Sequence, residues 1–285
     1  QISRIRVLLL ADDGSAYRNE VFLGADGAFQ IITKEGNAAL DPAAVVKASE
    51  LFASSEENSV RIQPAEEAGL LFLCDEAGNR ISNGYQGILE LRRYPEGFAV
   101  VSELSIEQYL CAVVPSEMPV TYELEALKAQ AVCARSYAYI QLQNGDYAAF
   151  GAHVDDTTNY QVYNKQQRSE KTTAAVLDTA GIVIRYNGRT AEAYYFSTSA
   201  GITGNGDAWN LTSDPDYSYL HGGLMKEGGG EVDLSSEEAF RQFIAEPDEA
   251  AYERKYPFYR WTAAADYTSP KVQKSIVEIL NTRRQ

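Results

Sequence analysis

One glutamate stands out in the segment VVPSEMPVTYELEALKAQAVCARSYAY, which runs from Val113 to Tyr139. Glu117 lies between a serine and a Met-Pro step, directly before a long alanine-rich segment. Val113, Val114 and Met118 give it apolar neighbours, and a partly apolar setting raises the pKa of a carboxyl group toward the value that a general acid needs near neutral pH. Glu117 is therefore a candidate general acid/base, although a glutamate at such a place is also typical of a helix cap or a salt bridge.

A second group of titratable residues lies in the segment AHVDDTTNYQVYN, where His153, Asp155 and Asp156 fall close together. Imidazole and carboxylate groups suit zinc and other divalent cations. Adjacent acids point in different directions, however, and the sequence has no second ligand cluster at a standard metal-binding spacing. A hydrogen-bonded loop is therefore predicted here, with no metal and no cofactor.

Nucleophilic catalysis is not favoured. Ser197 and Ser199 lie in STSAG, which lacks the GxSxG elbow, and the chain has two histidines in all. These serines are expected to hydrogen-bond a ligand or the turn itself. The three cysteines have no CxxC spacing and no protease signature, so core packing is predicted for Cys74, Cys111 and Cys133.

The overall charge excludes one large class of partners. The chain has 25 basic and 40 acidic residues, a net charge of −15, whereas general nucleic-acid binding needs a basic surface. No stretch reaches the roughly 18 consecutive apolar residues of a membrane span, and QISRIRVLLL is too short in its apolar part for a secretory signal. Any targeting or anchoring segment is therefore expected outside this sequence.

The elements that position these residues fall into two parts. Residues 1–103 are predicted to form a β-rich N-terminal subdomain, with a short helical or loop insertion within residues 41–67. Its strands are separated by turn signals at Asp13-Gly14, Asp26-Gly27, Gly78-Asn79 and Glu96-Gly97. Residues 104–285 are predicted to form a mixed catalytic part with a central alanine-rich helix and antiparallel hairpins, which makes the fold α+β.

The second part opens with two helices. Ser105 and Gln108 have the spacing of a capping box, and the apolar stripe that follows predicts a helix that Pro115 should end. The alanine-rich helix is expected from Thr121 to about Gln143, with a small-residue face that allows close packing.

Two cations lie on one face of the alanine-rich helix. Lys128 and Arg135 are seven residues apart, beside Val132 and Tyr139. Solvation at the surface is the ordinary explanation for such a pair, but the apolar neighbours also fit a buried arginine that holds a carboxylate or a ligand.

The sequence after the alanine-rich helix predicts several further elements. Asn187-Gly188 predicts a type I′ hairpin between GIVIRY and RTAEAYYF. Further expectations are a short helix around residues 236–244, a strand at FYRWTAAADY and an amphipathic segment over residues 269–280. Aromatic residues gather near the polar loops, where their faces suit sugar C–H surfaces although most are expected to pack: Tyr160, Tyr163, Tyr195, Trp209, Tyr217 and Tyr219.

The order of these motifs resembles one family. LSIEQYLCAVVPSEMP, ELEALKAQAVCARSYAY, DDTTNYQVY, AYYFSTSAG and FYRWT follow one another as in stage II sporulation protein D and the related amidase-enhancer proteins, over roughly residues 85–265. The resemblance implies a peptidoglycan lytic transglycosylase of the cell envelope that acts on glycan strands, preferably without stem peptides, with Glu117 as its catalytic residue. One carboxyl group suffices for that reaction, in which the sugar's own 6-hydroxyl replaces water and leaves an anhydro end, whereas hydrolases use a pair.

The same resemblance implies which residues bind the substrate. On the helix and in the loops beside the site these are Lys128, Gln130, Arg135, Gln161, Tyr163, Ser197, Ser199 and Tyr219. Some relatives hold zinc near residues 153–165, but this chain has His153 and no cysteine there, so no metal is predicted. STSAG also lacks the double glycine expected after the serine.

Two other readings stay open. The chain could be a non-catalytic module that binds glycan and stimulates a cell-wall amidase, as the enhancer branch of the family is named. It could also be a hydrolase of the same glycan, with Asp155 or Asp156 as the second carboxylate. Expected partners are peptidoglycan glycan strands and an amidase, outside the cytoplasm, with membrane contact only through an N-terminal anchor absent from this sequence.

Overall fold

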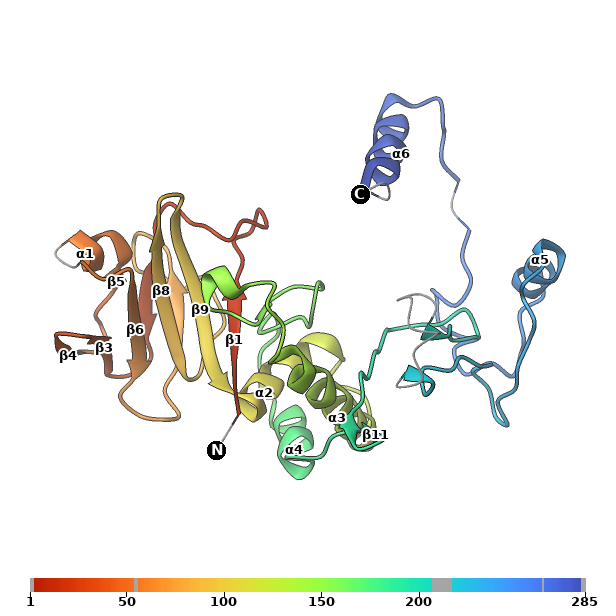
Figure 1. The fold of residues 1–285 in the computed structure, drawn as a ribbon, viewed down its shortest axis with the longest axis horizontal. Helices are drawn as coiled ribbons and strands as arrows, with labels where there is room; N and C mark the ends of the chain where they lie inside the picture. The colour runs from red at the N-terminus through yellow and green to blue at the C-terminus, as the bar shows by residue number, and fades with distance from the viewer. Residues whose placement is uncertain (1–2, 54–55, 207–216, 263, 283–285) are drawn as a thin grey trace. The chain divides into compact units, whose positions relative to one another are not determined.

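The computed structural model describes residues 3–53, 56–206, 217–262 and 264–282. It confirms a mixed α and β protein, with strands concentrated in the first third of the chain (Figure 1). Residues 1–195 and 196–285 form two compact units. The division predicted at residue 103 is one of sequence character and stays a prediction.

The first unit is built on a seven-stranded sheet with the strand order β10-β1-β9-β8-β6-β3-β4. Neighbouring strands are antiparallel except β1 and β10, which run parallel with Val7 opposite Val154. The strands are β1 (Arg4–Leu9), β3 (Phe29–Thr33), β4 (Gly36–Leu40), β6 (Ser59–Pro64), β8 (Ile88–Tyr94), β9 (Gly97–Ser105) and β10 (Val154–Asp155). The β1–β10 pairing brings the loop with the clustered acids to the edge of the N-terminal sheet.

A second sheet and a short helix complete the β-rich region. The three strands have the order β5-β2-β7 and are antiparallel: β2 (Phe22–Ala25), β5 (Val46–Lys47) and β7 (Leu71–Cys74). Helix α1 (Ala48–Ala53) confirms the helical insertion predicted within residues 41–67. Most buried apolar residues of both sheets belong to one core together with those of the helices that follow. Leu8 of β1 and Ala99 and Val101 of β9 form a smaller cluster with Ala152.

Helix α2 (Ile106–Glu117) continues directly from β9. The predicted capping box is confirmed, because Ser105 accepts from the Gln108 N–H while the Gln108 side chain accepts from the Ser105 N–H. The prediction that Pro115 ends the helix is wrong. The helix continues to Glu117, and the Met118 N–H still donates to the Val114 carbonyl at 3.0 Å. A proline costs the helix one hydrogen bond, at the carbonyl four residues before it, and that loss near a C-terminus is tolerated here.

Helix α3 (Leu124–Gln141) is the predicted alanine-rich helix, although it begins at Leu124 instead of Thr121 and ends at Gln141 instead of Gln143. Leu127, Ala131, Ala134 and Ala138 are fully buried, as expected for a central helix. It packs against α2 and α4 (Glu170–Asp178), and Figure 1 shows these three helices gathered beside the β1 and β9 end of the sheet.

Arg135 joins these three helices. Its side chain has no exposed surface, and its guanidinium donates two hydrogen bonds to the Glu107 carboxylate, at 2.9 and 2.8 Å. Further bonds reach the carbonyls of Ala131 and Val176. A buried guanidinium with a bidentate carboxylate and carbonyl acceptors fixes α2, α3 and α4 to one another.

The rest of the chain is less regular. The Asn187-Gly188 turn is confirmed, with φ of 46° and 80°, between two short strands: β11 (Arg185–Tyr186) and β12 (Arg189–Thr190). A 3-10 turn, η1 (Ala148–Phe150), precedes β10. The second unit contains the two helices expected there, α5 (Glu237–Ala245) and α6 (Pro270–Thr282).

The strand predicted at FYRWTAAADY is wrong for the residues that the structure describes in it. Arg260 instead donates hydrogen bonds to the Ala200 and Ile244 carbonyls, and both Phe258 and Trp261 are 71% exposed. The segment is held by side-chain contacts and has no partner strand among the described residues. None of the helices in the described part of the chain has the length and apolar character needed to cross a membrane.

We expect the Glu107→Ala variant to lose about 3–5 kcal/mol of unfolding free energy, because it leaves the buried Arg135 charge without its carboxylate. The matched control is Glu125→Ala, which removes an exposed partner of Lys128 and should cost no more than about 1 kcal/mol. Urea unfolding of both variants measures the difference. Equal small losses in the two variants would contradict the anchoring role of Arg135.

Candidate active site

Glu117 is the last residue of α2, and its carboxyl group is partly buried. The backbone N–H of Val162 donates to its Oε1 atom at 2.6 Å. No lysine or arginine among the described residues forms an ion pair with this carboxyl group. Glu117 is thus neither a solvated surface acid nor one half of a salt bridge, and it does not have the side-chain role of a helix cap.

Ser116, the residue before Glu117, holds a neighbouring loop in place. Ser116 Oγ donates to the Ala112 carbonyl at 2.7 Å and accepts from the backbone N–H groups of Lys165 and Gln166, at 3.1 and 3.2 Å. The Asn164 N–H also reaches the Ala112 carbonyl, at 3.3 Å. These contacts dock the loop of residues 161–166 onto the C-terminal turn of α2, so that its Val162 N–H meets Glu117.

The pKa of Glu117 lies above its ordinary value of 4.5. Burial raises it, because a carboxylate loses water in this position, and hydrogen bonds from the Val162 N–H and the Tyr195 hydroxyl offset only part of that effect. The group therefore keeps its proton to higher pH than an exposed glutamate does. That is the property a general acid needs.

Gln161 and Tyr195 extend the hydrogen bonds behind Glu117. The Gln161 amide is buried, and its Nε2 donates to the Tyr195 hydroxyl at 2.9 Å and to the Ala134 carbonyl at 3.3 Å. Its Oε1 accepts from the hydroxyl of the buried Tyr109 at 3.2 Å. Gln161 directly precedes Val162, whose N–H binds Glu117, but its polar atoms are engaged by protein groups. Its predicted contact with a glycan stays a prediction.

The acidic loop beside the site is a hydrogen-bonded structure, as predicted. Asp155 is fully buried and accepts from the Thr157 N–H and hydroxyl, both at 2.7 Å, and from Tyr147 and Asn159, both at 2.8 Å. Burial acts to raise the pKa of Asp155, but these hydrogen bonds outweigh it and the pKa lies below its ordinary value. Asp155 is an ionised structural group in the interior.

The neighbours of Asp155 are also engaged by the protein. Asp156 accepts from the Leu10 N–H at 3.0 Å and pairs with Lys165 at 2.5 Å. His153 Nδ1 accepts from the Arg6 N–H at 3.0 Å. Within the described residues, no three histidine, cysteine or acidic side chains gather as a metal site would require.

The other predicted helix residues differ in how they are placed. Lys128 pairs with Glu125 at 3.0 Å and with Asp178 at 3.2 Å. Gln130 has a buried Nε2 without a hydrogen-bond partner. Arg135 is the structural anchor described above, so its predicted contact with a glycan has no support from its buried position and stays a prediction.

The loop residues predicted to bind substrate fall in both units. Tyr163 is buried and its hydroxyl lies 3.1 Å from that of Ser102. Ser199 is buried in the second unit, where its N–H donates to Glu253 at 2.9 Å. Ser197 is exposed, and the Tyr219 ring lies 6.3 Å from that of Tyr217. Trp209 lies outside the described residues.

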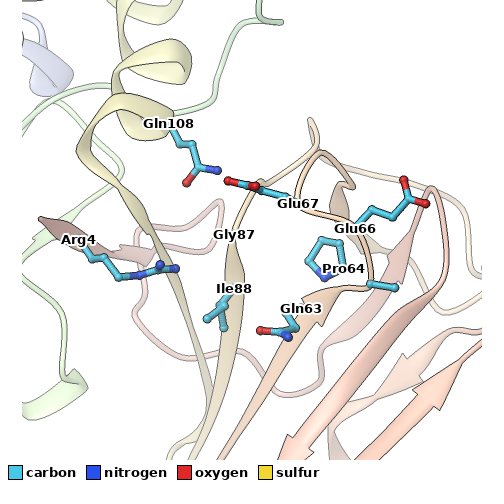
Figure 2. A pocket seen from close by; sticks show the side chains of 9 residues that line it. Arg4, Gln63, Pro64, Glu66, Glu67, Gly87, Ile88 and Gln108 are labelled. Atoms are coloured by element: carbon cyan, nitrogen blue, oxygen red, sulfur yellow. The ribbon is translucent and has the colours of Figure 1, made fainter. Parts of the chain in front are cut away.

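Three pockets in the described part of the first unit do not include Glu117 in their lining. One of about 320 Å³ is lined by Arg4, Gln63, Glu67 and Gln108 among others, and Figure 2 shows the Gln108 and Glu67 side chains pointing toward one another there. It includes none of the predicted site residues. A pocket of about 550 Å³ is bordered by Lys165, so it adjoins the loop that docks on α2.

Sequence reasoning did not assign the two groups that hold Glu117. The Val162 N–H is a backbone group, and the type of a residue does not indicate that its backbone N–H will bind a carboxyl group. Tyr195 was one of several aromatics near polar loops, and only the fold brings it to the end of α2. The motif AYYFSTSAG, which contains Tyr195, was the available signal.

The comparisons with known proteins match the region of the chain that contains Glu117. Residues 94–186, which include Glu117 and its docking loop, match the family described as Stage II sporulation protein. Stage II sporulation protein D of Bacillus subtilis (strain 168) is 37% identical over 129 residues, which cover 40% of this chain and 38% of that protein. The same-named protein of Bacillus amyloliquefaciens is 37% identical over 130 residues, with the same coverage.

A second kind of relative is similar over a shorter region. The Amidase enhancer of Bacillus subtilis (strain 168) is 39% identical over 102 residues, which cover 35% of this chain and 13% of that protein. The matched region of this chain is therefore similar to the stage II sporulation protein D and amidase-enhancer family, and the predicted resemblance is confirmed. The matches span at most 38% of these relatives' own length.

The raised pKa of Glu117 has a consequence for stability. A folded-state pKa above the unfolded one means that the native protein binds this proton more tightly, so stability is lost as pH rises from about 4.5 through the folded pKa. Glu117→Gln removes that loss. We expect the unfolding free energy of Glu117→Gln, relative to the wild type, to increase with pH across this window and then level off.

Urea unfolding of both proteins at several pH values between about 4 and 8 measures this difference. Glu76→Gln, which changes an exposed glutamate in the first unit, is the matched control and should show no such trend. A difference between Glu117→Gln and the wild type that does not vary with pH would mean that Glu117 titrates normally.

Proposed function

We propose that this chain is a peptidoglycan lytic transglycosylase that cuts denuded glycan strands in the cell envelope, with Glu117 as its general acid/base. The observation that carries the proposal is the state of this carboxyl group: partly buried, raised in pKa, held by a backbone N–H, and free of cationic partners among the described residues. Its place in the family-matched region is consistent with this role.

The hydrogen bonds of Glu117 imply different roles for its two carboxyl oxygens. Oε1 accepts from the Val162 N–H, which has no lone pair, so the acidic proton resides on Oε2. In the proposed reaction Oε2 protonates the glycosidic oxygen as the bond to the sugar breaks. The resulting carboxylate, stabilised by Val162 and Tyr195, then accepts the proton of the sugar's 6-hydroxyl, which closes the anhydro ring.

The hydrolase reading is not favoured. It needs a second carboxylate that can activate water, whereas Asp155 and Asp156 are both buried and saturated with protein hydrogen bonds or an ion pair. Asp155 accepts four hydrogen bonds, and Asp156 accepts one and pairs with Lys165, so each is already engaged by the protein and is a poor base.

The second candidate function is a glycan-binding enhancer of a cell-wall amidase. It is supported by the 39% identity to a protein named Amidase enhancer. In that case Glu117 would be a buried residue without a catalytic role, or a contact to the bound glycan. Replacing its carboxyl group would then leave the stimulation of an amidase unchanged. An amidase partner and an extracytoplasmic location, through an anchor outside this sequence, belong to either proposal.

We expect the protein to release fragments with 1,6-anhydro-muramic ends from denuded glycan strands, and Glu117→Gln to reduce the rate by at least about 100-fold because it removes the acid proton. Mass spectrometry of the products is the measurement. Glu76→Gln should cleave like the wild type. Reducing ends would support the hydrolase. Binding without cleavage, together with stimulation of an amidase, would support the enhancer, and an unchanged rate in Glu117→Gln would remove this residue from the mechanism.

A further inference from the structure

The orientation of the buried Gln161 amide is determined by its partners. A backbone carbonyl can only accept, so the atom 3.3 Å from the Ala134 oxygen must be the NH₂ group. The other end, Oε1, receives the Tyr109 hydroxyl at 3.2 Å. An exchange of the two ends would place an oxygen against the Ala134 carbonyl, inside the protein, and is therefore unfavourable.

This orientation has a consequence for Tyr195. The second hydrogen of Nε2 is donated to the Tyr195 oxygen at 2.9 Å, so that oxygen acts as an acceptor. A phenol has one hydrogen to donate. With its oxygen accepting from Gln161, the hydroxyl hydrogen is the one that Tyr195 can donate to Glu117, and a hydrogen bond from Tyr195 acts to lower the pKa of that carboxyl group.

We infer that Gln161 is a positioning residue, which directs the hydroxyl hydrogen of Tyr195 toward the Glu117 carboxyl group and so keeps the acidic proton of Glu117 directed away from the protein interior. The inference rests on the proposed role of Glu117 and gives Gln161 a function other than glycan contact. Val162 N–H and Tyr195 O–H are then both donors to this carboxyl group. Neither accepts its proton, which remains available to a substrate.

The other titratable groups near Glu117 do not change their protonation near neutral pH. They are the phenols of Tyr109 on α2, Tyr137 on α3 and Tyr195, and Cys133 on α3 lies near Tyr195. Burial raises the pKa of all four. A titration of this site near neutral pH therefore reports on Glu117.

The test follows the carboxyl ¹³C signal of Glu117 by NMR during a pH titration, with the signal assigned by its disappearance in Glu117→Gln. Tyr195→Phe removes a donor to the ionised form, so the titration midpoint should move upward. Gln161→Met should move it in the same direction. The double variant should match Tyr195→Phe alone, because Gln161 acts through Tyr195. Tyr137→Phe changes a nearby phenol outside this chain of hydrogen bonds and should leave the midpoint unchanged.

Kinetics provide a second measurement. In glycan cleavage, Gln161→Met should lower kcat about tenfold with little change in KM, and should shift the alkaline limb of the pH profile upward. Should Gln161→Met not fold, Gln161→Glu replaces it: its neutral acid form keeps the shape but has one hydrogen, which cannot serve both Ala134 and Tyr195.

An unchanged midpoint in the Gln161 variants, or shifts that add in the double variant, would overturn the inference. The NMR measurement needs no cleavage. If the variants show the expected shifts but the protein cuts no glycan, the hydrogen-bond arrangement is supported and the proposed reaction is wrong.

Discussion

The hydrogen bond from the Val162 N–H to Glu117, at 2.6 Å, depends on the docking of a whole loop onto the end of one helix. Ser116 and Ala112 of α2 hold residues 164–166 through their backbone N–H groups. A loop attached at several points keeps one donor fixed in front of a carboxyl group at little entropic cost during a reaction. The chemistry proposed for Glu117 requires this attachment, because it determines both the burial of the carboxyl group and which of its oxygens is free.

The position of α2 is in turn set by buried polar contacts. Arg135 binds Glu107, near the start of α2, while the strand β9 that leads into the helix lies inside the large sheet, between β1 and β8. The acid-rich loop is fixed from the other side by β10 and by the fully bonded Asp155. Two buried ionisable groups thus hold the framework: Arg135 is paired with a carboxylate, and Asp155 accepts four hydrogen bonds that lower its pKa. Glu117 has neither an ion-pair partner among the described residues nor enough hydrogen bonds to offset its burial, so its pKa is raised. This difference separates the two structural groups from the candidate catalytic one.

Much of this arrangement could be predicted from local sequence. The capping box at Ser105, the buried alanine face of α3 and the Asn187-Gly188 turn each depend on neighbouring residues, and each is confirmed. The expectation for Pro115 was wrong because a proline near the C-terminus of a helix costs one hydrogen bond, while the last turn still closes through the Met118 N–H and the Val114 carbonyl. The strand expected near Trp261 was wrong because strand formation needs a partner, which a local pattern of aromatic residues does not supply.

The site itself was predictable only in part. Glu117 was proposed from its motif, but the groups that affect its pKa are Val162 and Tyr195, with Gln161 beside them, which only the fold brings to Glu117. Backbone donors and long-range contacts leave no pattern in a single sequence. For the same reason the sequence could not distinguish a buried anchor such as Arg135 from a ligand contact such as the one predicted for Lys128.

A crystal structure of the Glu117→Gln variant with a bound glycan oligomer tests the central claim most directly. The account predicts that a glycosidic oxygen lies within about 2.6–3.2 Å of the residue 117 side chain, at the oxygen or nitrogen that Val162 does not contact. A glycan bound elsewhere on the first unit, with residue 117 covered by protein and out of reach of any glycosidic oxygen, would contradict it.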